Sequence, residues 1–295
     1  MTSTSTIACF SCETMEEFEA LRHREDYTLL QCKHCGARFW WPMLYDHPDQ
    51  PRGPVTYDES ICKIFEKRHE LGIAWIKKYR PTSRTLLDIA CRGGAFVKAA
   101  EQAGIEAWGI DAEADVIAVA KKVHGLKNLH AATLREFADK PGLKGYFDII
   151  SLFEILEHVT YPQVFFETAK GLLAPGGAIV LSIPNYDTLG GYPRENDAPY
   201  QWALWNEKTI RGFLERHGFR IAVLQHIDAS PRQFANFFHR TQPNKTEEQM
   251  ASSVFSYPKP SPVKSAMKKL FAPALGLINA AGLSPTIFVA AELVS

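Results

Sequence analysis

The sequence of 295 residues lacks the features that would direct it to a membrane or to export. Its start, MTSTSTIACF, has neither the basic beginning nor the apolar core of a secretory signal, and no apolar run is long enough to span a bilayer. It also lacks net charge, because 33 Lys and Arg balance 33 Asp and Glu, so its overall charge attracts neither nucleic acid nor an anionic membrane. We therefore expect a cytoplasmic protein without stable membrane insertion. Its expected partner is a small molecule or a peptide rather than nucleic acid, and a homo-oligomer stays open.

Cysteine is scarce, and four of the six cysteines form two CxxC pairs, Cys9 with Cys12 and Cys32 with Cys35. Two pairs at this spacing are typical of a zinc ribbon, because each turn directs two thiolates at one point and four thiolates complete a tetrahedral shell. Disulfides are not expected in a chain without an export signal, and a redox CxxC would not need a second pair. Four protein ligands leave no open position, so the predicted role of Zn²⁺ is structural.

The remaining chain divides into a linker and one large domain. We predict a zinc ribbon over residues 1–45 and a polar, proline-rich linker over 46–60. The large domain over 61–295 begins with a lead-in helix at 61–79, whose apolar positions recur at helical spacing with His69 as a polar exception. An insertion at about 229–284 interrupts this domain, and long insertions are commonly functional.

Strand and helix patterns alternate through the large domain, which predicts parallel strands in a sheet covered on both faces. Strands are expected over 85–90, 106–110, 128–132, 146–153, 177–184, 220–228 and 286–294, and helices over 95–104, 112–125, 161–173 and 206–217. Residues 261–283 have an apolar face that begins with three lysines, and Pro273 interrupts it. Packing against the sheet edge or a partner chain, closing over a substrate, and lying on a membrane surface are the alternatives for this segment.

A buried strand, a turn of small residues and a helix follow one another in LLDIACRGGAF (86–96). Small residues allow the backbone to approach a ligand, and the start of the helix presents free N–H groups. About twenty residues later Asp111 ends the next strand, where an acid accepts hydrogen bonds from ribose hydroxyls. The alternative for Asp88 is a helix or turn cap.

Together with FDIISLFEILEHV, GLLAPGGAIVLSIPN and W-x-x-x-T-I-R-G-F-L-E-R-H-G-F, these motifs resemble class I S-adenosylmethionine-dependent methyltransferases with an N-terminal zinc ribbon. The resemblance covers nearly the whole chain outside 229–284. It implies an α/β, doubly wound fold with a seven-stranded, mostly parallel sheet, and S-adenosyl-L-methionine as cofactor. It implies cofactor contacts at Asp88, Ala90 and Gly94 (methionine), Asp111 (ribose), Thr133 and Leu134 (adenine), Phe153 beside the cofactor and Tyr57 closing the pocket.

The turn departs from the family's usual GxGxG, because Ala90, Arg92 and Gly94 occupy the three positions. A side chain at Arg92 predicts that this position needs neither a left-handed backbone nor a bare approach to the ligand.

Glu154, Glu157 and His158 are spaced i, i+3 and i+4, which places them on one face of a predicted helix. Three interpretations stay open. The residues brace the fold by hydrogen bonds, or His158 is a general base with Glu154 as the second catalytic candidate. In the third, the trio holds Mg²⁺, as a similar ExxEH does in ubiquinone-biosynthesis and small-RNA 2′-O-methyltransferases.

The loop at 184–207 is rich in aromatic residues, which either anchor it on the sheet or form a pocket for a ring or a sugar face. The candidate substrate contacts are Tyr192, Tyr200, Trp202 and Trp205. We expect methyl transfer to a hydroxyl oxygen of an aromatic or sugar-containing metabolite. A nonenzymatic binding module with a degenerate cofactor site and a nucleic-acid methyltransferase are the alternatives.

Overall fold

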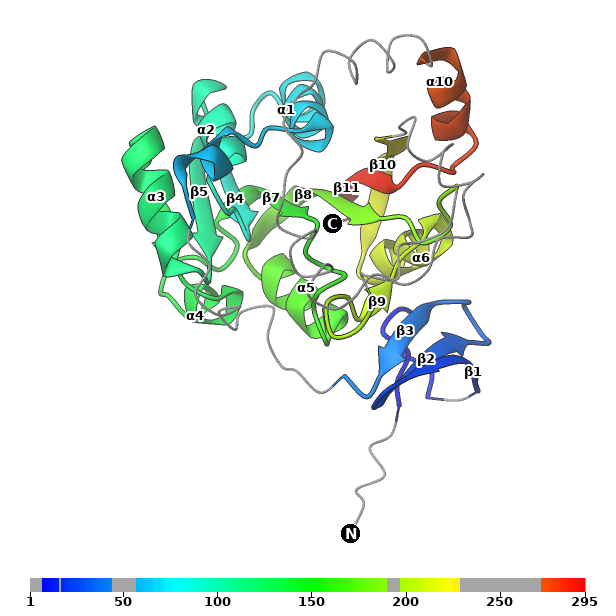
Figure 1. Ribbon diagram of the computed structural model, residues 1–295. Helices are drawn as coiled ribbons and strands as arrows, with labels where there is room; N and C mark the ends of the chain where they lie inside the picture. Colours follow the sequence, from blue (N-terminus) through cyan, green and yellow to red (C-terminus); the bar gives the residue numbers. More distant parts are fainter. Residues whose placement is uncertain (1–6, 16, 44–56, 190–196, 229–271, 295) are drawn as a thin grey trace.

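The fold is a seven-stranded sheet between two layers of helices, with a smaller four-stranded sheet packed beside it (Figure 1). The structure is a computed structural model that describes residues 7–15, 17–43, 57–189, 197–228 and 272–294. The predicted α/β class and the mostly parallel seven-stranded sheet are confirmed.

The large sheet has the strand order β10-β11-β8-β7-β4-β5-β6, and β11 is antiparallel to both of its neighbours. All five residues of β4 are buried, as expected for a strand covered on both faces. The strands are β4 (Thr85–Ile89), β5 (Glu106–Asp111), β6 (Leu129–Ala131), β7 (Phe147–Phe153), β8 (Leu173–Pro184), β10 (Phe219–Ile227) and β11 (Thr286–Leu293). Every strand predicted for this sheet is present.

Two hydrophobic cores lie between the large sheet and its helices, one on each face of the sheet. Leu86 of β4 joins the core under one helix layer, and Leu87 joins the core under the other, because neighbouring strand residues face opposite ways. The first layer contains α1 (Lys67–Tyr79), α2 (Ala95–Gln102) and α3 (Ala114–His124), and the second contains α4 (Leu134–Ala138), α5 (Pro162–Lys170) and α6 (Glu207–Arg216).

The predicted lead-in helix at 61–79 is wrong in its first part. The chain instead forms a short 3₁₀ helix, η1 (Glu59–Lys63), before α1 begins at Lys67. A capping box explains this start, because the Glu66 side chain accepts from the His69 backbone and the His69 side chain accepts from the Glu66 backbone.

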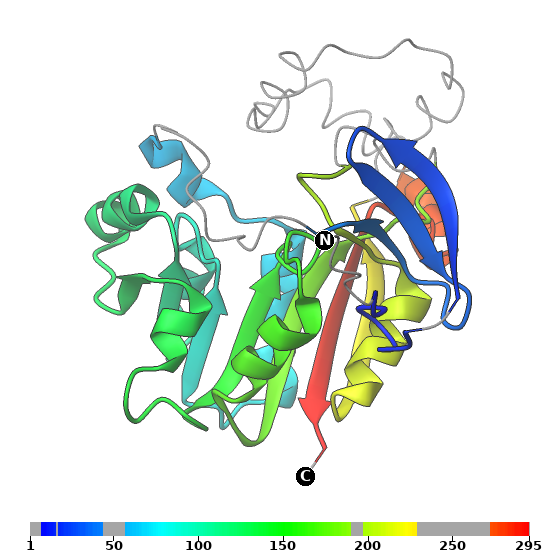
Figure 2. The same ribbon diagram turned by 90° about the horizontal axis from the view of Figure 1, so that it is seen from below.

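The smaller sheet has the antiparallel order β1-β2-β3-β9 and includes a strand that the sequence analysis did not predict. Its strands are β1 (Phe18–Arg24), β2 (Tyr27–Cys32), β3 (Arg38–Trp41) and β9 (Ala203–Leu204). The last of these comes from the chain after β8, about 160 residues beyond β3 along the sequence. The smaller sheet and η1 both lie at the end of the large sheet where the parallel strands finish (Figure 2).

The N-terminal ribbon shares its hydrophobic core with the large domain. The Phe10 ring lies 4.7 Å from the ring of Trp205, which in turn lies 5.2 Å from the ring of Phe213 on α6. Much of the predicted linker and of the insertion lies outside the described residues, so the domain boundaries stay a prediction. Of the 261–283 segment, the structure describes residues 272–283, which include helix α10 (Ala272–Ala280); its Leu275 and Ile278 pack with Leu189, and the alternatives for the segment stay open.

Among the described helices, none has the length and apolar character needed to cross a membrane.

Candidate active site and cysteine cluster

Two cavities open at the carboxyl end of β4, and both are lined by Ala90. In open α/β sheets, ligands bind at this edge, beyond the carboxyl ends of the parallel strands. The first cavity is open to solvent, and its lining includes Arg68, His69, Asp88, Gly93 and Phe153. The second is also open to solvent, and its lining includes Ile110, Asp111, Leu134, Ile155 and Phe165.

The turn after β4 keeps a glycine-like backbone with only one of its three usual glycines. Ala90, Arg92 and Gly94 have φ values of 60°, 49° and 72°, all in the left-handed region. The prediction that Arg92 avoids this region is therefore wrong. Gly93 is the position that tolerates no side chain, because an added Cβ would lie 2.4 Å from the carbonyl oxygen of Ile61 on η1.

Asp111 is fixed by two backbone N–H groups at the edge of the second cavity. Arg92 N donates to its Oδ2 at 2.9 Å, and Glu113 N donates to its Oδ1 at 3.0 Å. Burial raises the pKa of Asp111 above its ordinary value, although both N–H groups oppose that shift. A carboxylate held in this way keeps a fixed orientation toward a ligand.

Asp88 lies at the end of β4 and lines the first cavity. Ser151 Oγ donates to its Oδ1 at 2.6 Å, so the side chain is neither a helix cap nor a turn cap. Burial raises the pKa of Asp88 to about 7, which leaves the group sensitive to any charge that enters the cavity.

Arg68 and His69 are cavity residues that the sequence analysis did not assign to the site. The Nδ1 of His69 accepts from Glu66 N at 2.9 Å, which places the proton of the neutral ring on Nε2. Burial lowers the pKa of His69 to about 3, so the ring is neutral at physiological pH. The signal that could have found it is its place as the polar exception on an apolar helix face.

Three of the predicted cofactor contacts do not line either cavity. Gly94 caps α2, and Thr133 caps α4 through a capping box with Glu136. Tyr57 packs against the core under α1 and α2. The cofactor roles of these three residues stay predictions.

The ExxEH segment does not form a helix, so the predicted single face for Glu154, Glu157 and His158 is wrong. Strand β7 continues to Phe153, and a turn follows it. Within the described residues, the four cysteines are the one group of three or more metal-ligating side chains that converge. The Mg²⁺ interpretation of the trio therefore finds no support.

Glu154 and His158 are held by different partners. Glu154 has a left-handed φ of 52° and accepts a hydrogen bond from Ser182 Oγ at 2.9 Å, while burial raises its pKa. His158 Nδ1 lies 2.6 Å from the carbonyl oxygen of Tyr200, so Nδ1 is the donor of this hydrogen bond. The Nε2 atom lies 3.7 Å from Glu157 Oε1.

The aromatic loop is mainly an anchor. Trp202 is 2% exposed in a cluster with Trp40, and Trp205 is 1% exposed between Phe10 and Phe213. This burial favours the anchoring alternative, and the role of the two residues as substrate contacts stays a prediction. Tyr200 is half-buried and its substrate role stays a prediction, while Tyr192 lies outside the described residues.

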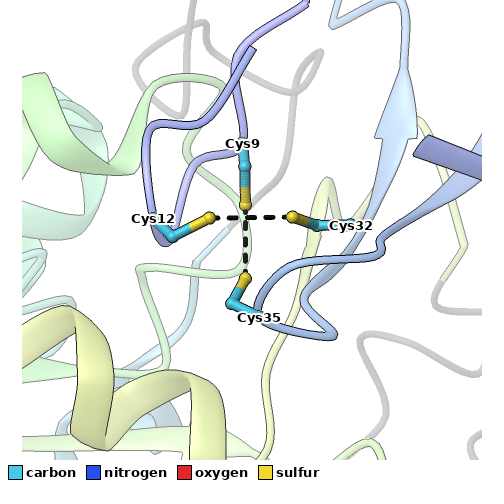
Figure 3. Close-up of side chains that lie close together, drawn as sticks. All are labelled: Cys9, Cys12, Cys32 and Cys35. Carbon is cyan, nitrogen blue, oxygen red and sulfur yellow. Dashed lines mark hydrogen bonds between the residues drawn. The ribbon is translucent and has the colours of Figure 1, made fainter. Parts of the chain in front are cut away.

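The four cysteine sulfurs point toward one another from two turns of the ribbon (Figure 3). Cys9 Sγ lies 3.6 Å from Cys35 Sγ, Cys12 Sγ lies 3.6 Å from Cys32 Sγ, and all four lie within 4.8 Å of one another. Four sulfurs at about 2.3 Å from a tetrahedral zinc ion are about 3.8 Å apart. The cluster therefore has the size and the ligand type that zinc requires.

Comparison with known proteins assigns the family. Residues 57–226, which include both cavities, match the model of a family described as a methyltransferase domain. A ubiquinone biosynthesis O-methyltransferase from Pseudomonas paraeruginosa is 30% identical over 210 residues, or 69% of this chain and 73% of that protein. Another from Bordetella avium is 31% identical over 134 residues, or 43% and 54%. The chain belongs to the methyltransferase domain family and is an S-adenosylmethionine-dependent methyltransferase.

Solved structures with little sequence identity share the fold. A complex of the Haloferax volcanii Trm112 methyltransferase activator with a methyltransferase matches at a TM-score of 0.53 and 15% identity, over 80% of this chain and 94% of that one. The [4+2]-cyclase SpnF matches at a TM-score of 0.50 and 16% identity, over 77% and 80%.

Proposed function

We propose that this methyltransferase transfers the methyl group of S-adenosylmethionine to a hydroxyl oxygen of a small molecule that carries an aromatic ring or a sugar. The observation that carries the proposal is the alignment of 69% of this chain with proteins named ubiquinone biosynthesis O-methyltransferase. The zero net charge of the chain agrees with a small acceptor.

The two cavities suit the two halves of the cofactor. In the second, Asp111 would accept hydrogen bonds from the ribose hydroxyls and Leu134 would pack against the adenine. In the first, Asp88 would face the amino group of the methionine half. Arg68 and the Nε2–H of His69 are donors in the same cavity, and they would hold its carboxylate.

The bound cofactor supplies an activated methyl group on a sulfonium, so the protein mainly aligns the acceptor oxygen with it. A base is needed because a hydroxyl acceptor loses its proton during transfer. The turn after β7 offers two candidates for that base. The Glu154 carboxylate lies close enough to Arg68 of the first cavity to feel its charge, and the His158 ring is oriented by the hydrogen bond that its Nδ1 donates to Tyr200 O.

Binding of S-adenosylhomocysteine tests the cofactor placement. We expect Asp111→Ala to weaken the affinity about 10- to 100-fold in calorimetry, because two charge-assisted hydrogen bonds to the ribose are lost. The matched control is Asp115→Ala, an exposed acid on α3. Equal affinities of the two variants would contradict the ribose role of Asp111.

Conservative variants of the turn test the base. Glu154→Gln and His158→Gln should both keep cofactor affinity, and the variant that removes the base should lower turnover about 10²- to 10⁴-fold on a phenol, catechol or sugar acceptor. If Glu154 is the base, the rate rises with pH as its raised pKa is passed, and Glu154→Gln removes that rise. Unchanged turnover in both variants would show that neither Glu154 nor His158 accepts the proton.

We also propose that the four cysteines hold a structural Zn²⁺. The ligand type and the sulfur separations support this assignment. Metal analysis of the purified protein should find about one zinc per chain, and a variant with Cys12→Ser and Cys35→Ser should lose it.

A further inference from the structure

Strand β9 connects the ribbon with the chain that follows β8, because it pairs with β3 of the ribbon. Arg38 and Phe39 of β3 pair with Leu204 and Ala203 of β9, and Trp40 N donates to Trp202 O at 2.9 Å. Strand β3 follows directly after the Cys32–Cys35 turn, in which Cys32 N donates to Ala37 O at 2.8 Å. The cysteine turn and β9 are therefore joined through one short strand.

The same loop holds the turn after β7 from its other side. Trp202 N donates to Glu157 O at 2.7 Å, and Ala203 N donates to the same carbonyl at 3.3 Å. The imidazole of His158 donates to Tyr200 O at 2.6 Å. Residues 200–203 thus contact the ribbon and the predicted catalytic turn at the same time.

An ion pair secures the other end of this loop. Arg22 of β1 lies 2.5 Å from Asp197, whose side chain is 4% exposed, and the Arg22 guanidinium also lies over the ring of Trp40. A carboxylate this deeply buried is costly without its partner, so Arg22 fixes the position of the loop. The loop from 197 to 204 is consequently held at both ends by the ribbon.

We propose that the ribbon is a positioning element of the active site, which sets the orientation of His158 and Glu157 through the 197–204 loop. Metal binding at the four cysteines then stabilises the turn after β7 as well as the ribbon. The metal-dependent part rests on the proposed zinc site, while the coupling of Arg22 to the turn does not. Trp202, Asp197 and Arg22 act here as positioning residues.

Hydrogen exchange measured by mass spectrometry on the full chain tests the metal-dependent part. Removal of zinc by a chelator should speed exchange of the Trp202 and Ala203 amides about tenfold, and that of peptides covering 153–160, with little change in 86–111. Re-addition of zinc should restore the protection. Unchanged exchange at 153–160 and 197–204 after zinc is lost would overturn the metal link.

A variant tests the coupling with zinc in place. Arg22→Met should raise exchange in 197–204 and 153–160 while the bound zinc and the affinity for S-adenosylhomocysteine stay within about twofold of wild type. Arg24→Met, on the same face of β1, is the matched control. Arg22→Lys keeps a cation beside Asp197 and should restore most of the protection.

Exchange that is equally slow in Arg22→Met and Arg24→Met would overturn the coupling, even if chelation unfolds the whole chain. Cofactor affinity is measured in the same samples, so loss of the proposed cofactor site is separated from loss of the coupling. No acceptor is needed for either measurement.

Discussion

Ala90 and Arg92 adopt a backbone conformation that L-residues avoid, with φ values of 60° and 49°. Such a conformation costs about 1–2 kcal/mol per residue, and it persists where surrounding structure imposes it. In this conformation Arg92 N donates a hydrogen bond to Asp111, which orients the carboxylate that is predicted to bind the ribose. The family's glycines supply the same geometry without strain.

Replacement of Arg92 by glycine should therefore stabilise the unliganded protein. We expect Arg92→Gly to raise the free energy of unfolding by about 0.5–1 kcal/mol, since relief of strain exceeds the added entropy of the unfolded chain. Lys144→Gly, in an exposed turn with ordinary φ, is the control and should lower it by a similar amount. Urea unfolding measures both, and a loss of stability in Arg92→Gly would contradict the strain argument.

Asp88 should make cofactor binding depend on pH. Its pKa of about 7 lies above the ordinary value of 3.8, so below pH 7 the carboxyl is protonated and must lose that proton to face a cationic amino group. The affinity for S-adenosylmethionine should rise between pH 5.5 and 7, below the pKa of about 8 of an α-amino group. In Asp88→Asn the affinity should be lower and this rise absent, as calorimetry across the range would test. If the affinity of Asp88→Asn rose with pH as much as that of wild type, a group other than Asp88 would cause the pH dependence.

At the scale of elements, β9 and the loop before it decide what the aromatic residues do. Sequence alone does not distinguish a pocket from an anchor, because aromatic residues suit both. Pairing of β9 with β3 favours the anchor, since Trp202 and Trp205 are buried against the ribbon. The partner strand is more than 160 residues away along the chain, and no local pattern reveals such a pairing.

Truncation of the Trp205 side chain should lower the stability of the protein. We expect Trp205→Ala to lower the free energy of unfolding by about 3–5 kcal/mol, because the ring fills the core between Phe10 and Phe213. Tyr161→Ala, with a side chain 47% exposed at the start of α5, should change it by less than about 0.5 kcal/mol. A stable Trp205→Ala protein with an altered KM for the acceptor would return this residue to the substrate site.

The ExxEH turn illustrates where local patterns are insufficient. Spacing of i, i+3 and i+4 gives one face only if the segment is helical, and β7 extends through Phe153 instead. Glu154 then takes a left-handed φ of 52° and contacts Ser182 on the neighbouring strand. The position of β8 decides this contact, so tertiary structure overrides the helical pattern.

At the scale of the whole molecule, the ribbon and the large domain share one hydrophobic core. Cys9, Cys32 and Phe39 of the ribbon belong to the same cluster as Leu87 of β4 and Phe213 of α6. Arg216 of α6 also donates to the carbonyl oxygen of Ser11. We therefore expect the ribbon and the large domain to unfold together.

Calorimetry should therefore show one unfolding transition for the zinc-loaded chain. Zinc removal should lower the Tm of that whole transition by several degrees. For a domain of this size, each loss of about 1 kcal/mol in the free energy of unfolding lowers the Tm by about 2–4 °C. A matched scan without chelator is the control. Two separate transitions, with only the smaller one sensitive to the chelator, would indicate an independent ribbon.

The sequence by itself determined the alternation of strands and helices, the two cysteine pairs and the acids at the ends of β4 and β5, because these follow from local spacing. Only the tertiary structure decided what Trp202 and Glu154 contact, since their partners lie far away along the chain, and only it placed Arg68 and His69 in the cavity beside β4. The turn after β4 shows the same division: its sequence predicted an ordinary backbone at Arg92, and the packing of Gly93 against η1 together with the bond to Asp111 imposed a left-handed one.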